Sequence, residues 1–305
     1  MKVLVTGSCV LDVSMEINEL PGPGEDVNTK GLTLSLGGMA YNVYSALSLF
    51  GTDCILGCPV GEGIIADTVS GLLNKAGRRP IGVIPGLDNG MCLCLVDKSG
   101  ERSFISHHGA EYRFNPEFFK NTDFNDIGWI YASGLEIEDT DGGKIIDFLE
   151  EKKKKVFLAP GPRLDKLSPE FTDRLYRLRP VLHINEREAS LITGRSGRAE
   201  NAEQISRITG NTVIITLGAD GTLLKEPGKA PELIPTVKVG MVDATGAGDN
   251  HAGSVLACLN KGMSFSDAVK AANIVSGFAV QQKGAVLKEE SFQKAMAELK
   301  KRNLF

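Results

Sequence analysis

Short apolar runs with strand character alternate with segments of helical period along most of the chain. Helical spacing places Val43, Leu47 and Phe50 on one face, for example, and Gly51 ends that segment. Such an alternation is typical of an α/β fold built on a doubly wound, mostly parallel sheet. The strand-like runs are 2–5, 53–60, 129–133, 156–158, 181–184 and 213–216, and a long helix is expected at 266–282.

Two regions, 12–36 and 81–107, interrupt this alternation with strand patterns that have no helix between them. In the first region Leu32, Leu34 and Leu36 alternate as in a half-buried strand. The second region contains strand-like runs at 81–84, 91–96 and 102–106, with a hairpin turn signal at Asp97-Lys98-Ser99-Gly100.

We therefore expect the two regions to form a small β-sheet lid. The lid would consist of residues 12–36 and 81–107, and the α/β core of residues 1–11, 37–80 and 108–305. Exposed lid strands have unpaired edges that often pair with a second copy, so a homodimer through the lid is expected.

The composition is that of an ordinary globular protein, with 42% hydrophobic and 24% charged residues in a chain of 305. The net charge of −4 gives no electrostatic reason to expect a nucleic-acid partner. None of the six cysteines forms a C-x-x-C pair, so we expect buried free thiols in a reducing cytoplasm and no cysteine-bound metal. The first apolar run is short and no apolar segment is long, so we expect neither an export signal nor a membrane span.

The richest local chemistry lies at 237–259, where an apolar run of strand character, a glycine turn and a helical segment follow one another. Gly246 and Gly248 leave room for an incoming group, and the first N–H groups of the helix would point outward at the positive end of its dipole. With Ala247 they form an expected anion cradle. Asp249 could take a proton from a hydroxyl while the cradle holds a transferring phosphoryl group. The alternative is that Asp249 only favours the helix dipole.

A second glycine pattern, Gly61-x-Gly63-x-x-Ala66, is similar to a dinucleotide fingerprint and would suit a nicotinamide-dependent oxidoreductase. That assignment requires an acidic residue at the end of the next strand, and the run 81–85 has none. We therefore rank this function last.

Polar or glycine-rich residues recur directly after the expected strands. In an open α/β sheet these positions line the edge at which ligands bind. They are Asp12, Glu136, Arg163, Asn185, Gly218 and Asp243.

Two stretches resemble the signatures of the ribokinase, or PfkB, family. Asp243-Ala244-Thr245-Gly246-Ala247-Gly248-Asp249 is similar to its carboxy-terminal signature, and Gly37-Gly38-Met39-Ala40-Tyr41-Asn42 is similar to its amino-terminal one. The two occur far apart and in the family's order, and the resemblance extends over essentially the whole chain. The chain contains no G-x-x-x-x-G-K-[ST] motif and no protein-kinase signature set.

The resemblance implies a ribokinase-like fold whose lid closes over a small hydroxylated substrate, usually a sugar, which is phosphorylated by ATP. It assigns Asp249 as the catalytic base and Gly246, Ala247 and Gly248 as the anion hole. A nucleoside kinase of the same family is the nearest alternative. A non-catalytic, ligand-binding regulator on the kinase fold is a distant one.

The resemblance also implies which residues bind the ligands. Asp12, Gly38, Asn42 and Glu136 match substrate-binding positions, although Asp12 in an Asx turn and Asn42 as a helix cap are alternatives. The nucleotide positions are Asn185, Glu188, Thr216, Gly218, Gly221, Asn273 and Gly284, and a helix-surface asparagine is the alternative for Asn273.

Two cations are implied as well. Asn185 and Glu188 resemble an element that organises Mg²⁺ through water near the phosphates. Asp243 and the carbonyl of Thr245 stand where many family members bind a monovalent cation such as K⁺.

The chain departs from the family pattern at a few positions. His251 stands where an apolar residue is common, and packing of the helix is favoured over contact with substrate. Arg163 follows Ala159, where an aspartate is frequent, and either an anion contact or a surface salt bridge would suit it. His107 and His108, in the strand insertion, lie where a lid could meet a ligand, but two adjacent lid histidines are more often exposed bystanders, and we expect the latter.

Overall fold

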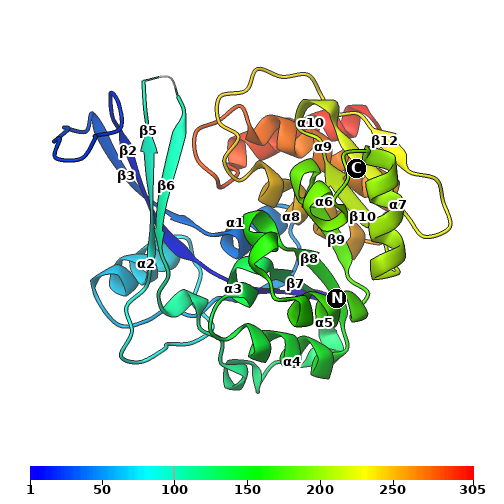
Figure 1. Ribbon diagram of the computed structural model, residues 1–305, viewed down its shortest axis with the longest axis horizontal. Helices are drawn as coiled ribbons and strands as arrows, with labels where there is room; N and C mark the ends of the chain where they lie inside the picture. Colours follow the sequence, from blue (N-terminus) through cyan, green and yellow to red (C-terminus); the bar gives the residue numbers. More distant parts are fainter. Residues whose placement is uncertain (99) are drawn as a thin grey trace.

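The strands of the computed structural model, which describes residues 1–98 and 100–305, form two separate sheets (Figure 1). The larger sheet has eight strands in the order β12-β11-β10-β9-β8-β7-β1-β4. They are β1 (Lys2–Thr6), β4 (Cys54–Gly57), β7 (Ile127–Ser133), β8 (Lys155–Ala159), β9 (Val181–Asn185), β10 (Val213–Thr216), β11 (Thr222–Lys225) and β12 (Glu232–Ile234). Neighbours from β4 to β10 are parallel, and β11 and β12 are antiparallel. The predicted doubly wound, mostly parallel sheet is confirmed.

Helices cover both faces of this sheet because successive strand residues point to opposite faces. Val3 and Tyr131 belong to one buried apolar cluster, and Leu4 and Ile130 to the other. The first cluster is completed by α1 (Met39–Leu49), α2 (Ile64–Lys75), α8 (Ala247–Asn260), α9 (Phe265–Ala279) and α10 (Glu289–Lys301). The second is completed by α3 (Gly134–Glu138), α4 (Gly142–Lys152), α5 (Pro169–Arg177), α6 (Glu186–Thr193) and α7 (Arg198–Thr209). Short 3-10 helices are η1 (Ala110–Tyr112), η2 (Pro116–Phe119), η3 (Phe124–Asp126), η4 (Gly161–Lys166) and η5 (Gly218–Asp220).

The path of the chain creates a topological switch point beside β1. From β1 the chain adds β4 on one side, and it later adds β7 on the other. Because the connections leave in opposite directions, the carboxyl ends of β1 and β7 flank the position where ligands bind in open α/β sheets. The two predicted signatures lead into α1 and α8, which pack on the same face of the sheet.

The smaller sheet stands beside the core, on the left in Figure 1, and is formed by the two regions predicted as the lid. Its order is β3 (Gly31–Gly37), β2 (Val10–Glu16), β5 (Met91–Val96) and β6 (Arg102–His107). The hairpin turn predicted at 97–100 joins β5 to β6, and its residue Ser99 lies outside the described residues. The exact boundaries between lid and core stay a prediction.

The strand predicted at 81–84 is wrong. Val83 makes only an isolated bridge with Val60. The N–H of Val60 donates to the carbonyl of Gly82 over 3.1 Å, and that of Ile84 donates to Val60 over 2.8 Å. This segment therefore runs beside the chain that follows β4, and the first lid strand of the second region begins at Met91.

The strand predicted to lead into the glycine turn is also wrong, since residues 235–242 are described as neither strand nor helix. The larger sheet ends at β12, and the chain then crosses α9. There Val237 lies so close to Gly277 that a Cβ built on the glycine would be 2.4 Å from its side chain. The N–H groups of Val242 and Asp243 both donate to the carbonyl of Val280, at 2.7 and 3.0 Å, instead of to a neighbouring strand.

Two expectations from composition can be compared directly with the structure. The six cysteines are free thiols, as predicted, although Cys54, Cys92 and Cys94 are only partly buried. Within residues 1–98 and 100–305, no helix combines the length and apolarity needed to cross a membrane.

The pattern Gly61-x-Gly63-x-x-Ala66 does precede a helix, α2, but the chain itself occupies the helix terminus. The Asp88 carboxylate accepts the N–H groups of Ile65 and Ala66, at 3.3 and 2.8 Å. These are the donors that a dinucleotide phosphate would need. The ranking of an oxidoreductase as last is therefore supported by the geometry.

We predict that Asp88→Ala lowers the free energy of unfolding by about 1–2 kcal/mol, because it leaves the first N–H groups of α2 without acceptors. Urea denaturation measures this loss. Asp67→Ala is the matched control, since Asp67 is an exposed acidic residue in the same helical turn. Equal losses in the two variants would contradict a capping role for Asp88.

Candidate active site

Helices α1 and α8 approach each other closely at a glycine. Gly253 lies one turn after Asp249, and a Cβ built on it would be 2.7 Å from the Cβ of Ala46, which lies one turn after Asn42. Only a residue without a side chain allows this approach. As a result, Nδ2 of Asn42 donates to Oδ2 of Asp249 over 2.8 Å. The packing of two helices thus joins one residue from each sequence signature.

The other end of the Asn42 amide is left unused. Its carbonyl oxygen has no hydrogen-bond partner among the described residues, although the residue is only 5% exposed. An unpaired buried acceptor is costly, on the order of 1–3 kcal/mol. A ligand hydroxyl at this position would supply the missing donor.

The glycine turn is held firmly to the segment that follows α9. Gly246 has a φ of +71°, and a Cβ on it would lie 2.4 Å from the carbonyl oxygen of Ala285, so glycine is required there. Nδ2 of Asn250 donates to the carbonyls of Gly246 and Ala285, at 2.7 and 2.8 Å. The N–H of Ala247 already donates to Ala244 over 3.1 Å. An anion would therefore depend on Gly246, Gly248 and the first turn of α8 for its donors.

Asp249 is partly buried, and burial raises the pKa of its carboxyl to about 7. The hydrogen bond from Asn42 opposes this shift, and the nearby charges of Glu136, Asp12 and Glu188 add to it. A carboxyl that titrates near neutrality can accept a proton from a hydroxyl more readily than an ordinary aspartate can. Burial also raises the pKa of Asp12 to about 6.

Asp12 lies in a cavity of 670 Å³ between the lid and the core. The lid contributes Asp12, Ser14 and Phe104, and the core contributes Thr245 and Gly284, among others. A cavity of 740 Å³ at the amino ends of the strands, near Trp129, holds none of the predicted site residues. The lid cavity is therefore the one associated with the candidate site.

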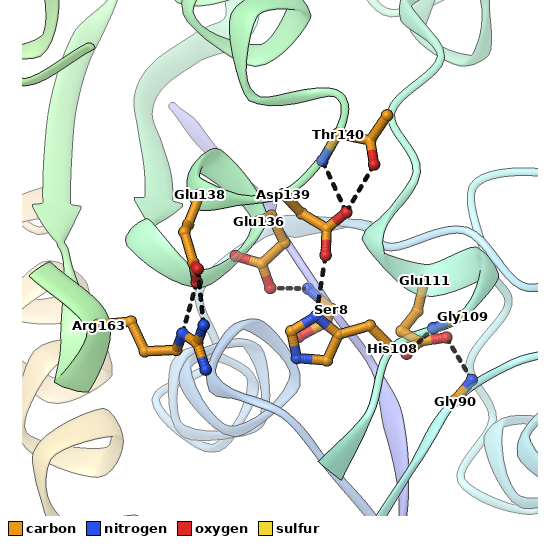
Figure 2. A network of polar contacts seen from close by, with 10 residues as sticks. All are labelled: Ser8, Gly90, His108, Gly109, Glu111, Glu136, Glu138, Asp139, Thr140 and Arg163. Carbon is orange, nitrogen blue, oxygen red and sulfur yellow. Dashed lines mark hydrogen bonds and ion pairs between the residues drawn. The ribbon is translucent and has the colours of Figure 1, made fainter. Parts of the chain in front are cut away.

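Gly38 and Glu136 lie beside the carboxyl end of β1. Gly38 precedes α1, whose Tyr41 donates its N–H to the carbonyl of Ser8 over 3.3 Å. The carboxylate of Glu136 accepts the N–H of Ser8 over 2.7 Å (Figure 2). It also accepts the hydroxyl of Ser133. Glu136 is only 2% exposed, so the structure gives it a role in joining the ends of β1 and β7. Its contact with a substrate stays a prediction.

Most of the predicted nucleotide residues follow two neighbouring strands. Asn185 and Thr216 are paired in register at the ends of β9 and β10, and Gly218 and Gly221 follow in the next turn. Asn185 caps α6, because its Oδ1 accepts the N–H of Glu188 over 2.9 Å. In return, the Glu188 carboxylate accepts the N–H and the Nδ2 of Asn185 at 3.0 and 2.8 Å. Gly284 lies across the cavity and donates its N–H to Asp243.

Asn273 belongs to a buried polar network and not to a surface. It is 3% exposed, so the alternative of a helix-surface asparagine is wrong. Its Nδ2 donates to the carbonyl of Ile234 over 3.0 Å, and its Oδ1 accepts the hydroxyl of Thr222 over 2.7 Å. With its amide used in this way, a direct contact with a nucleotide base is a prediction that the geometry does not favour.

The same network contains His251, which packs within the core as predicted. Its Nδ1 lies 2.8 Å from Nε2 of His183, and its Nε2 lies 3.1 Å from Oδ1 of Asn273. Because the asparagine oxygen only accepts, His251 carries its proton on Nε2 and accepts the Nε2 proton of His183. Burial lowers the pKa of His251 to about 4, so both rings are neutral at pH 7.

Arg163 and His108 each contact an acidic side chain (Figure 2). Arg163 is held by both carboxylate oxygens of Glu138, at 2.5 and 2.6 Å, which matches the salt-bridge alternative. Nδ1 of His108 contacts Asp139 over 2.9 Å, and its ring stacks on Tyr112. The prediction that His108 is an exposed bystander is therefore wrong, whereas His107 is exposed.

Sequence reasoning missed Arg102, which reaches from β6 to Asp243 across 3.0 Å. The side chains of β6 alternate between the cavity and the outer face of the lid, and only the pairing of β5 with β6 decides which residues face the cavity. The sequence therefore carried no direct signal for this contact.

The two expected cations fit the structure differently. In the described part of the chain no three His, Cys, Asp or Glu side chains gather as metal ligands. The Mg²⁺ that Asn185 and Glu188 would hold through water stays a prediction. A monovalent cation does not fit Asp243 as it stands. That carboxylate already accepts the N–H groups of Thr245 and Gly284 and contacts Arg102.

We predict that Asp249→Asn is more stable than the wild type at pH 8. The folded protein holds a proton on Asp249 up to about pH 7, whereas the unfolded chain releases it near the ordinary value of 3.8, so ionisation costs stability as the pH rises. A fully buried group would give about 4 kcal/mol, and partial exposure reduces the expected gain to about 2 kcal/mol.

Denaturation at several pH values measures the free energy of unfolding of Asp249→Asn and of the wild type, and the difference between them should decrease towards pH 4. Asp267→Asn is the control, because Asp267 occupies the third position of α9 as Asp249 does in α8. The pKa of Asp267 is lowered by its hydrogen bonds with Lys270 and Ser264, so its replacement should act in the opposite direction. A pH-independent difference for Asp249→Asn would contradict the raised pKa.

Comparison with known proteins gives a consistent assignment. The model of the pfkB family carbohydrate kinases matches residues 1–291. The chain is 30% identical to the uncharacterized sugar kinase YegV of Escherichia coli (strain K12), over 92% of this chain and 89% of that protein. Among solved structures, Arabidopsis thaliana ribokinase complexed with ribose and ATP superposes with a TM-score of 0.80 at 20% identity, covering 97% of this chain and 98% of that one. Burkholderia thailandensis nucleoside kinase in complex with inosine superposes with a TM-score of 0.75 at 20% identity, over 93% and 91% of the two chains.

The matched family model extends over nearly the whole chain and includes both signatures and the lid strands. The superpositions extend over both sheets and confirm the ribokinase-like α/β fold that the resemblance implied. The chain therefore belongs to the pfkB family of carbohydrate kinases, and it is an ATP-dependent kinase with the ribokinase fold.

Proposed function

We propose that this kinase phosphorylates a hydroxyl of a small sugar or sugar-like compound, with Asp249 as the catalytic base. The observation that carries the proposal is the pairing of Asp249 with Asn42 at the start of α8. A substrate hydroxyl at this point would donate to the carboxylate of Asp249, and a neighbouring hydroxyl would donate to the unpaired oxygen of Asn42. Asp12 and the backbone at Gly38 would orient the rest of the substrate.

In the proposed reaction the hydroxyl oxygen attacks the terminal phosphorus of ATP as its proton passes to Asp249. The bond from that phosphorus to the bridging oxygen breaks, and ADP leaves. Phosphoryl transfer depends mainly on positioning and on compensation of charge. The N–H groups of Gly246 and Gly248, at the positive end of the α8 dipole, would stabilise the transferred group. The pKa of about 7 for Asp249 supports its role, because such a carboxylate holds the proton well enough to take it from an alcohol.

ATP would lie along Asn185, Thr216, Gly218 and Gly221 and end at the glycine turn. The bound ATP of the Arabidopsis ribokinase supports this cofactor. Mg²⁺ would be held through water by Asn185 and Glu188. The carboxylates around Asp249 support a metal requirement, because a triphosphate placed among them needs a cation to offset the repulsion.

A nucleoside is the alternative substrate, and one residue favours it. Phe104 is 54% exposed on the wall of the lid cavity, where it could stack on a base. The inosine complex of the Burkholderia nucleoside kinase supports this possibility within the same fold. Around Asp12, the hydroxyls of Ser14, Thr33 and Ser35 favour a sugar, although leucine and valine side chains line the same cavity.

We also propose that the protein is a cytoplasmic homodimer that joins through the outer face of the lid. Strand register aligns Leu34, Val13, Leu93 and Ile105 in one apolar row across the four lid strands. At the two ends of this row, Leu34 is 46% and Ile105 is 62% exposed. Val13, in the middle of the row, is only 9% exposed, so it is the two exposed apolar ends that suit contact with a second copy. The six free cysteines support a reducing compartment.

We predict that Leu34→Lys combined with Ile105→Lys converts the dimer to a monomer at micromolar concentration, because two charges would enter the apolar contact. Light scattering after gel filtration measures the mass. Leu233→Lys is the control, since Leu233 is 56% exposed on β12, at the far edge of the larger sheet. A wild-type monomer, or a dimer that survives both substitutions, would contradict the proposed interface.

We predict that Asp249→Asn lowers kcat by about 10²–10⁴-fold, because no base then accepts the hydroxyl proton. ADP release with Mg-ATP measures this over a panel of pentoses, hexoses, sugar acids, sugar phosphates and nucleosides. In the wild type, kcat/KM should fall about tenfold per pH unit below the pKa near 7.

Asp267→Asn again provides the matched control and should keep full activity. Turnover that is unchanged in Asp249→Asn would contradict the catalytic assignment. Absence of turnover with every compound, together with retained ATP binding in calorimetry, would favour the non-catalytic regulator.

A further inference from the structure

The carboxylate of Asp243 is the charged anchor of the glycine turn. Its Oδ1 accepts the N–H of Thr245 over 2.8 Å, inside the turn, and its Oδ2 accepts the N–H of Gly284 over 2.9 Å, in the segment after α9. Asp243 therefore ties together the two segments that Asn250 also bridges. Its state of charge decides how firmly the turn before α8 is held.

Asp243 is 6% exposed, so its negative charge needs compensation close by. Burial alone would favour the neutral form, but the N–H groups of Gly284 and Thr245 and the charge of Arg102 hold the pKa of Asp243 below its usual value. Of these groups only Arg102 carries a full positive charge. Its Nη2 lies 3.0 Å from Oδ1, and its side chain is 24% exposed.

Arg102 comes from the lid and not from the core. It is the first residue of β6, on the face of the lid sheet that lines the cavity. A second pair, Lys283 with Glu16, also joins core and lid, at 2.9 Å. That pair is exposed on both sides, at 76% and 53%, so solvent screens it and it contributes little. The Arg102–Asp243 pair is therefore the less exposed of the two contacts, and it alone includes the carboxylate that holds the glycine turn.

We propose that the guanidinium of Arg102 supplies Asp243 with the positive charge that a monovalent cation would otherwise supply, so that this kinase works without K⁺. A cation added at Asp243 would share one carboxylate with Arg102 and be repelled by it. This inference rests on the proposed function for its catalytic consequence, but the occupancy of Asp243 does not depend on it.

The proposal has a consequence for the lid. Because the compensating charge is part of β6, the glycine turn is fully held only while the lid lies over the core. Arg102 is therefore a positioning residue, which acts on the anion cradle through Asp243 and does not itself touch the transferred group. Its removal would leave Asp243 with a vacant cation position of the kind that K⁺ fills.

Arg102→Met tests this substitution of charge, since it keeps an unbranched side chain and removes the guanidinium. Thermal unfolding and ADP release are both measured in KCl and in choline chloride at equal ionic strength. The wild type should show equal melting temperatures in the two salts and a change in kcat/KM of less than about twofold. In choline, Arg102→Met should lose about 10–100-fold in kcat/KM, as when a residue that orients another is removed.

Potassium should then restore most of that loss and raise the melting temperature of Arg102→Met in a saturable way. Lys283→Met is the matched control, because it breaks the other contact between lid and core. Whatever the size of its effect, that effect should not respond to K⁺. This control separates the charge at Asp243 from a general loosening of the lid.

Two results would overturn the proposal. One is a wild type whose melting temperature or activity rises specifically with K⁺, and the other is an Arg102→Met variant that responds to K⁺ in neither measurement. If no hydroxyl compound is phosphorylated, the proposed function fails, but the melting temperatures in KCl and choline still decide the role of Arg102.

Discussion

The close approach of α1 and α8 is the constraint on which the site depends. Gly253 removes the side chain that would keep the two helices apart, and the contact of Asn42 with Asp249 follows one turn away. The same approach draws the carboxylate out of solvent and raises its pKa to about 7. The close packing of α1 on α8 thus determines both the position of Asp249 and the pKa of its carboxyl.

The lid sheet has two different faces, because successive side chains of a strand point to opposite sides of the sheet. Residues such as Asp12 and Ser14 face the cavity, and alternate residues lie on the other face, where Val13 packs into the core and Leu34 is exposed. A shift of one residue in the register would exchange the polar and apolar faces. Arg102 depends on the same register, so substrate contact, the proposed dimer and the proposed charge at Asp243 share one structural basis.

Much of this arrangement could be predicted from the sequence. The alternation of strands and helices gave the core, and the strand at 91–96 was predicted with its observed ends. The apolar residues at 237–242 led to the wrong prediction of a strand, because the spacing of apolar residues does not reveal that the sheet has already ended at β12. Asn273 could not be placed, since its partners at 222 and 234 are distant in sequence. The contact of Arg102 with Asp243 could not be predicted, because the face of the lid sheet on which a residue lies is determined only by the pairing of the strands.

The buried imidazole of His251, two residues beyond Asp249 on α8, changes what a titration of the whole molecule would reveal. Its folded pKa of about 4 lies below the ordinary 6.5, so it favours unfolding as the pH falls through that interval. Asp249 favours unfolding as the pH rises through nearly the same interval. The two neighbours therefore oppose each other, and His183 and Asp12 add to the two opposing directions. A stability profile that is almost level between pH 4 and 7 would conceal strongly perturbed groups of opposite effect.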